Sequence, residues 1–319
     1  MRKNTVPEEE LAKLSRSELL KLINEDNVSL LKSIGADELY DEMKKSGALS
    51  RFLVRIAYKK GDKEGTRRRT SRNLKFIAPS NILRPYVQSD KCIVIGFNHP
   101  SLGEILRLIY NGFDCYEGRD FLFPVNIPWY ETLVPVIPLL EATGVKITPI
   151  ITPSTEAKLN KMFQGNEEKL ARIQQFKIAF ERIYMKTAKE CADENGIIVV
   201  APSATRQAEV FADEIARRGE GHIHPTMTLL AHRICNKEDS EVTFQPVTIF
   251  EPVWNDRKFN FFKNYEIYPC QPFTGKEVYE LSSGHSRDFD YQFLKRIDEL
   301  YSQRYGSVFS QKTDVEEEI

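Results

Sequence analysis

One short stretch places an imidazole and a carboxylate at a spacing that could support general base chemistry: Asn98-His99-Pro100-Ser101-Leu102-Gly103-Glu104. An apolar run typical of a buried strand precedes it at 92–97, and an apolar-periodic segment typical of a helix follows at 105–110. Glu104 can fold back across such a turn, accept the Nδ1 hydrogen of His99 and leave Nε2 as a base. Because the stretch holds no strong nucleophile, this dyad favours a mechanism in which a substrate hydroxyl attacks and His99 takes its proton.

The same two residues also fit a purely structural interpretation. His99 could be a polar residue that caps the helix, and Glu104 could be a first-turn carboxylate favoured by the helix dipole. A histidine and an acid at this spacing often occur together by chance. The spacing alone therefore leaves both interpretations open.

The elements that must position this stretch indicate an α/β fold. Apolar runs predict further strands at 121–126, 145–151, 197–200 and 242–250, and periodic segments predict helices at 134–140, 166–194, 226–234 and 287–305. Alternating strands and helices imply a mostly parallel central sheet flanked by helices. The stretch would then lie at the carboxyl end of a strand, where open α/β sheets bind ligands.

The chain divides into three predicted regions. Short helical patterns between residues 15 and 58 indicate a small N-terminal helical domain, which together with a basic linker occupies 1–75. The α/β domain is predicted at 76–310, and an acidic, disordered tail at 311–319.

Composition narrows the class of protein. The chain has 319 residues, 41% hydrophobic and 29% charged, and a net charge of −1, which gives no overall attraction to nucleic acid. No run is long and apolar enough for a spanning helix, and the charged amino terminus is unlike a secretory signal, so a cytoplasmic location is expected. Five scattered cysteines predict reduced, mostly buried thiols.

A strongly basic run covers residues 58–72 and includes Arg67, Arg68 and Arg69. Its simplest interpretation is a solvated loop. A second interpretation is a patch that holds the protein at an anionic membrane surface, where each cation contributes about 1 kcal/mol.

Four segments in order resemble the glycerolipid acyltransferases, the superfamily that includes glycerol-3-phosphate and lysophosphatidic acid acyltransferases. The family hallmark Asn-His-x4-Asp is matched by Asn98 to Glu104, with glutamate in place of aspartate. The second block is similar to 128–151 and the fourth to 244–247. The third block, usually Phe-Pro-Glu-Gly-Thr-Arg-Ser, is matched by Ala201-Pro202-Ser203-Ala204-Thr205-Arg206-Gln207, where Ser203 replaces the acid and Ala204 the glycine. The family's arginine after the second block is also absent near Thr152, so the acceptor pocket is altered.

The resemblance implies transfer of an acyl group from acyl-CoA or acyl-carrier protein to a hydroxyl of glycerol-3-phosphate or a lysophospholipid, without a metal or another cofactor. His99 and Glu104 would be the catalytic residues, and Arg206 would bind a phosphate or carboxylate of the acceptor. Ser203, Thr205, Ser101 and Asn98 complete the candidate substrate site, with Ser101 and Asn98 serving to form the turn or orient the dyad rather than to react.

Two other functions remain open: a catalytically impaired, lipid-binding relative, and an acyltransferase with a non-glycerol acceptor. His222 and His224 lie two positions apart, but the sequence shows no third ligand at a suitable spacing, so no metal site is predicted.

Overall fold

The computed structural model describes residues 52, 55–98, 104–133, 137–202, 226–235, 242–250, 263–283 and 288–305. Within them, eight strands form one sheet. The strands are β1 (Ser80–Ile82), β2 (Ile93–Phe97), β3 (Phe121–Asn126), β4 (Val145–Ile150), β5 (Ile197–Val200), β6 (Thr243–Phe250), β7 (Tyr265–Pro269) and β8 (Phe273–Thr274). The helices are α5 (Lys63–Ile77), α6 (Glu104–Cys115), α7 (Ile127–Leu133), α8 (Ile137–Glu141), α9 (Pro153–Met162), α10 (Glu167–Asp193), α12 (Thr226–Ile234), α13 (Gly275–Ser282) and α14 (Asp288–Tyr305).

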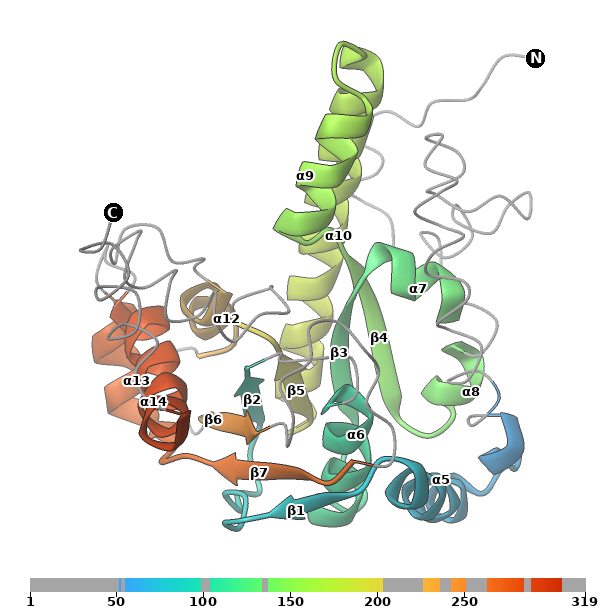
Figure 1. The fold of residues 1–319 in the computed structure, drawn as a ribbon, viewed down its shortest axis with the longest axis vertical. Helices are drawn as coiled ribbons and strands as arrows, with labels where there is room; N and C mark the ends of the chain where they lie inside the picture. Colours follow the sequence, from blue (N-terminus) through green and yellow to red (C-terminus); the bar gives the residue numbers. More distant parts are fainter. Residues whose placement is uncertain are drawn as a thin grey trace, which may run out of the picture.

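The strand order is β1-β7-β6-β2-β5-β3-β4, with β8 beside β6 (Figure 1). Strands β6, β2, β5, β3 and β4 all run parallel, whereas β7 and β8 are antiparallel to β6. The predicted α/β class with a mostly parallel sheet is therefore confirmed. The carboxyl ends of these five parallel strands lie along one edge of the sheet, which we call the carboxyl edge.

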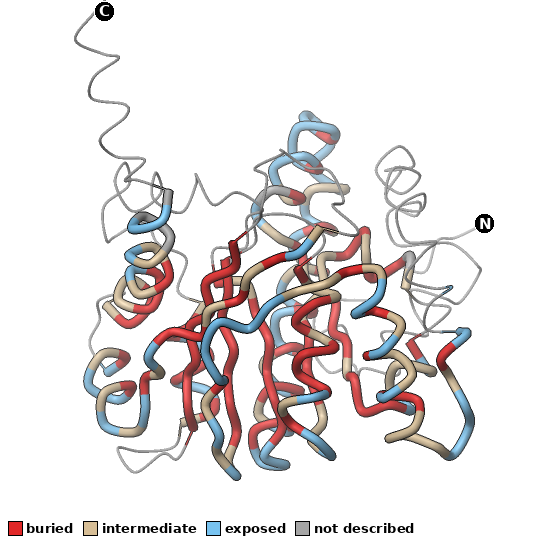
Figure 2. The backbone as a smooth tube through the Cα atoms, turned by 60° about the horizontal axis from the view of Figure 1, so that its bottom comes forward, coloured by how far each residue is buried: buried red, intermediate tan, exposed pale blue. Residues whose placement is uncertain are grey.

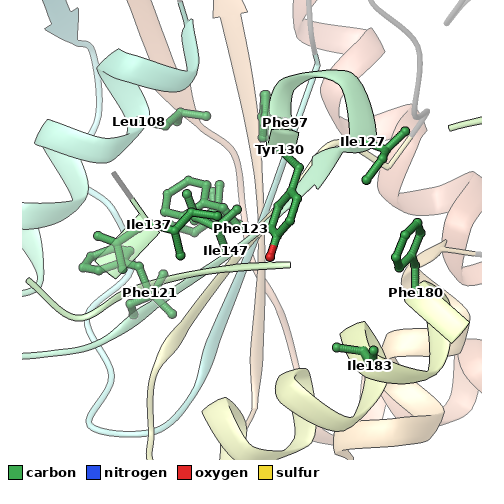
Figure 3. Packing of buried hydrophobic residues seen from close by; sticks show 14 of the residues in the cluster. Phe97, Leu108, Phe121, Phe123, Ile127, Tyr130, Ile137, Ile147, Phe180 and Ile183 are labelled. Atoms are coloured by element: carbon green, nitrogen blue, oxygen red, sulfur yellow. The ribbon is translucent and has the colours of Figure 1, made fainter. Parts of the chain in front are cut away.

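Both faces of the sheet are covered by helices, because its central strands are apolar on both sides. Ile93 and Ile95 of β2 pack in one cluster with Leu108 and Phe113 of α6, as Figure 3 shows for Leu108 and several other members. Val94 belongs to a second cluster, formed with α10, α12 and α14. In Figure 2 the central strands are buried along their length.

Left-handed turns follow two of the helices. Gly144 has a φ of 78° after α8 and Asn195 a φ of 55° after α10, a left-handed conformation that glycine and asparagine adopt most readily. At the start of α9, Thr152 accepts a hydrogen bond from the Thr155 amide and Pro153 occupies the first helical turn.

The described part of the chain contains no helix with the length and apolarity needed to cross a bilayer. The predicted helices of 15–51 and the acidic tail at 311–319 lie outside the described residues. Helix α5 covers residues 63–72 of the basic run, and the predicted domain boundary at residue 75 falls inside this helix.

All five cysteines are free thiols, and Cys92, Cys191 and Cys270 are buried. Burial raises the pKa of Cys191 to about 12 and also raises the pKa of Cys92, so both remain protonated at neutral pH. We expect iodoacetamide at pH 8 to alkylate half-buried Cys115 well before either, and to reach Cys92 and Cys191 only after unfolding in guanidinium. Peptide mass mapping would contradict this if native Cys191 were labelled as fast as Cys115.

Candidate active site

The two sequence motifs leave neighbouring strands at the carboxyl edge. Strand β2 lies between β5 and β6, with Gly96 aligned to Val200 on one side and Pro246 on the other. The chain therefore leaves β2 at Asn98 and β5 at Ala201 from adjacent positions on the same edge.

Gly96 shows how closely the two segments approach. A Cβ on Gly96 would lie 3.2 Å from Cγ of Pro202 and would overlap with Cε1 of Phe293. Pro202 belongs to the motif that also contains Ser203 and Arg206, so the start of that motif packs directly against the strand that leads to His99.

We expect Gly96→Ala to destabilise the fold by about 1–3 kcal/mol, because the buried Phe293 ring must move to admit the methyl group. Thermal unfolding measures the loss. Combining the change with Phe293→Leu should recover part of it, since the smaller side chain relieves the clash. Strictly additive losses in the double variant would show that the contact does not carry the effect.

Asn98 fixes the backbone immediately before His99. Its side chain is buried, its Nδ2 donates to the Ile249 carbonyl at 3.0 Å, and its Oδ1 accepts from the Ile249 amide at 2.6 Å. These bonds continue the β2–β6 pairing, whose last residue pair is Phe97 with Val247. Asn98 is therefore positioned to orient the following residue, whereas its predicted contact with substrate finds no support in this geometry.

Glu104 is the first residue of α6, and it is completely buried. The position is favourable for a carboxylate because the helix dipole is positive there. A carboxylate present only for the dipole could stay in water, whereas a buried one must be compensated by specific polar or charged groups. Burial of Glu104 therefore fits a carboxylate that interacts with groups inside the fold better than it fits a solvated first-turn acid.

Arg107 is a second buried charge that sequence reasoning missed. It is fully buried one turn after Glu104, donates from Nε to the Pro79 carbonyl at 3.0 Å and from a terminal nitrogen to the Lys263 carbonyl at 2.7 Å. Its guanidinium carbon lies 3.7 Å from the centre of the Tyr265 ring. The available signal was an arginine inside the apolar run 105–110, at the i+3 position that shares a helix face with Glu104.

The two residues that flank the second motif segment, Pro202 and Thr226, contact each other. The hydroxyl of Thr226, the first residue of α12, donates to the Pro202 carbonyl at 3.3 Å. Buried Asp290 holds the start of α12 by accepting from the amides of Met227 at 2.6 Å and Thr228 at 3.1 Å. Both ends of the interval 203–225 are thereby fixed at the carboxyl edge.

The most reactive predicted residues fall within the two intervals 99–103 and 203–225, which are outside the described residues. These residues are His99, Ser101, Ser203, Thr205 and Arg206. The residues that flank 203–225 are in contact, whereas the contact between His99 and Glu104 stays a prediction.

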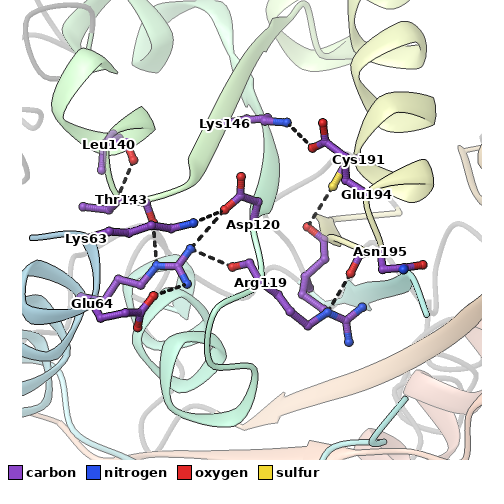
Figure 4. A network of polar contacts seen from close by, with 12 residues as sticks. Lys63, Glu64, Arg119, Asp120, Leu140, Thr143, Lys146, Cys191, Glu194 and Asn195 are labelled. Atoms are coloured by element: carbon purple, nitrogen blue, oxygen red, sulfur yellow. Dashed lines mark hydrogen bonds and ion pairs between the residues drawn. The ribbon is translucent and has the colours of Figure 1, made fainter. Parts of the chain in front are cut away.

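The basic run is organised differently from the predicted cationic patch. Arg67 is buried: Nε donates to the Thr143 carbonyl at 2.6 Å, a terminal nitrogen donates to the Arg119 carbonyl at 2.7 Å, and Asp120 lies within 3.5 Å of the guanidinium. Figure 4 shows this network at the ends of the strands opposite the carboxyl edge. Burial lowers the pKa of Arg67, and the nearby charges of Glu64 and Asp120 oppose that effect.

The expectation that Arg67 faces a membrane is therefore wrong. Arg69 is also engaged, because it donates to the Ala57 carbonyl at 3.1 Å and pairs with Asp62 at 3.2 Å. Of the three arginines, Arg68 is the exposed one.

The described residues contain no group of histidine, cysteine and acidic side chains arranged to hold a metal ion. His232 contacts the Ser282 carbonyl through Nε2, and His222 and His224 lie outside the described residues. A scan against protein-family models finds no match for this chain, and a search of the curated proteins finds no significant match either.

Proposed function

We propose that this protein is an acyltransferase that moves a fatty acyl group from an acyl thioester to a hydroxyl of glycerol-3-phosphate or a lysophospholipid, as one step of phospholipid synthesis. The observation that carries the proposal is the placement of Asn98-His99-x4-Glu104. The stretch leaves the central strand β2 at the carboxyl edge, Asn98 fixes its start, and its acid is buried at the first residue of α6. A solvated loop would need neither the fixed asparagine nor the buried acid.

In the proposed reaction His99 acts as general base and then as general acid. Nε2 takes the proton of the acceptor hydroxyl while the hydroxyl oxygen forms a bond to the thioester carbonyl carbon. The carbon–sulfur bond then breaks, and the leaving thiolate takes the proton from the imidazolium, which gives an ester and a free thiol. Glu104 stabilises the imidazolium during this exchange.

In the proposed reaction, the first turn of α6 stabilises the negative charge that develops on the carbonyl oxygen of the thioester. Amide groups at the amino end of a helix have no partner within the helix and can donate to an oxyanion. Helix α6 begins at Glu104, and in the proposed reaction the amides of its first turn would donate to the charge that develops on the carbonyl oxygen. This arrangement requires no acyl-enzyme.

Acceptor binding is assigned to the second motif segment. Arg206 would hold a phosphate or carboxylate by paired hydrogen bonds, with Ser203 and Thr205 as neighbouring donors. The close packing of Pro202 against Gly96 supports the placement of this segment beside His99. Ser203 and Ala204, which replace the usual acid and glycine, are expected to alter the choice of acceptor.

The proposed partners are acyl-CoA or acyl-carrier protein and a small phosphorylated acceptor, without nucleic acid or a cofactor. We propose a cytoplasmic enzyme that acts at the inner membrane face.

The direct test is release of free thiol from radiolabelled acyl-CoA and acyl-carrier protein, measured together with the ester product over a panel of acceptors. Glycerol-3-phosphate and lysophosphatidate come first in the panel, followed by amines and sugars. Acceptor-dependent thiol release with stoichiometric ester supports the proposal. Binding of acyl chains without turnover on any acceptor would instead support the lipid-binding alternative. That alternative is favoured by Ser203 and Ala204, which stand in place of the usual acid and glycine.

A further inference from the structure

Helix α5 has an unusual outer face. Its inner face is buried and contains Thr66, Arg67, Ser71 and Leu74. Positions 68, 72, 75 and 76 follow the i, i+4, i+7, i+8 spacing of a single helix face, and all four are exposed. The face that points away from the fold therefore combines three cations with an aromatic ring.

Two of these cations lack an acidic partner among the described residues. Arg68 and Arg72 form no ion pair with any residue that the structure describes, whereas Lys75 pairs with Asp114 at 2.6 Å and Lys63 with Asp120 at 2.6 Å. An unpaired guanidinium on an exposed face is free to bind an external anion.

Exposed apolar side chains follow these cations along the chain. Phe76 is 79% exposed, the largest exposure of any large hydrophobic residue in the described part of the chain. Shortly after it, Ile82 and Leu83 are 38% and 48% exposed, and Arg84 beside them is exposed as well. A surface that bound only a polyanion would gain nothing from Phe76, Ile82 and Leu83.

Ile82 is the last residue of β1, which lies at an edge of the sheet, and Leu83 follows it. Strand β1 pairs with β7 on one side, and on its other side the described residues place no strand. In Figure 1, β1 and α5 both lie along the lower border of the molecule. The edge is thus accessible to a large flat partner.

The surface is connected to the candidate active site through α6. Helix α5 runs antiparallel to α6, since Ser71 donates to Asp114 near the end of α6 at 2.8 Å while Leu74 packs with Tyr110 one turn earlier. The chain after α5 reaches the first turn of α6, where Arg107 binds the Pro79 carbonyl at 3.0 Å. Phe76 therefore lies at the end of α5 that is nearer to Glu104.

We infer that this α5–β1 surface, formed by Arg68, Arg72, Phe76, Ile82, Leu83 and Arg84, docks on an anionic lipid bilayer. The arginines bind lipid phosphates, and Phe76, Ile82 and Leu83 enter the boundary between headgroups and acyl chains. The inference rests on exposure and charge, and it stands whether or not the chain transfers acyl groups.

Co-sedimentation of the full-length protein with vesicles tests the inference independently of any enzymatic assay. Vesicles of phosphatidylcholine mixed with phosphatidylglycerol should bind the protein, less so as salt rises, and vesicles of phosphatidylcholine alone should bind weakly. The pair Arg68→Ala and Arg72→Ala should lower the partition coefficient about 30-fold. Phe76→Ser should lower it about tenfold while leaving the salt dependence in place.

Matched controls come from exposed residues elsewhere on the described surface. The pair Lys158→Ala and Lys161→Ala removes two exposed charges from α9, and Leu229→Ser removes a 46% exposed apolar side chain from α12. Both controls should bind vesicles like the wild type. Thermal unfolding of every variant excludes misfolding as the cause of a loss.

Three outcomes would overturn the inference. The first is absence of wild-type binding to the anionic vesicles, and the second is equal loss in the α5 and α9 charge variants. The third is loss through the arginines but not through Phe76, together with equally tight binding of soluble heparin, which would identify a site for soluble polyanions instead.

Discussion

Replacing His99 by alanine should lower kcat for acyl transfer by about 10²–10⁴-fold, because the hydroxyl then loses the base that takes its proton during attack. The KM for the thioester should change little, since the imidazole acts in the transition state rather than in binding the donor. Thiol release from acyl-CoA or acyl-carrier protein, followed with the best acceptor of the panel, measures both parameters.

His232→Ala is the matched control for this prediction. His232 lies on α12 and contacts the Ser282 carbonyl, so its loss removes an imidazole without affecting the proposed chemistry. Full activity in His232→Ala and loss in His99→Ala would assign the base to His99. Undiminished transfer by the His99 variant across every acceptor would refute the mechanism.

Replacing Arg107 by methionine should lower the free energy of unfolding by about 3–5 kcal/mol. The change keeps much of the side-chain volume but leaves the Pro79 and Lys263 carbonyls without their charged donor and removes the stacking on Tyr265. It also removes the positive charge one turn from buried Glu104. Urea unfolding followed by circular dichroism measures the loss.

Arg72→Met serves as the control, since exposed Arg72 should tolerate the change to within about 0.5 kcal/mol. Arg107→Lys should fall between the two, because a lysine keeps the charge but cannot bind both carbonyls with a planar fork. If Arg107→Met unfolds at the same urea concentration as Arg72→Met, the buried guanidinium does not stabilise the fold.

The sheet could be predicted from the sequence because its central strands are short apolar runs bounded by glycine, proline or polar residues. The predicted strands at 197–200 and 145–151 correspond to β5 and β4, and the long helix at 166–194 corresponds to α10. Burial on both faces makes such strands uniformly apolar, which is a strong local signal. The order of the strands was not predicted, because strand pairing depends on contacts between residues that are distant in the sequence.

Helix α5 was missed for a physical reason. Its sequence is so rich in arginine that it resembles a solvated loop, and nothing local reveals that Arg67 turns inward to bind the Thr143 and Arg119 carbonyls. Arg107 was missed in the same way, because a buried arginine is recognised by distant backbone carbonyls rather than by its neighbours in sequence. Helices α9 and α13 were also not predicted, although Thr152 and Pro153 gave a start signal for α9.

Part of the candidate site followed from spacing and resemblance. The motif predicted the positions of Asn98 and Glu104 at the carboxyl edge, but not that the amide of Asn98 would be occupied by Ile249. The interaction of His99 with Glu104 depends on side-chain placement within 99–103, and it stays a prediction.

The contact between Thr226 and Pro202 has a consequence for how this protein can diversify. A loop whose ends are already in contact can double in length at an entropic cost of only about 0.6 kcal/mol. Its length therefore has little effect on the stability of the sheet. If 203–225 binds the acceptor as we propose, its length can therefore change while the central strands keep their architecture.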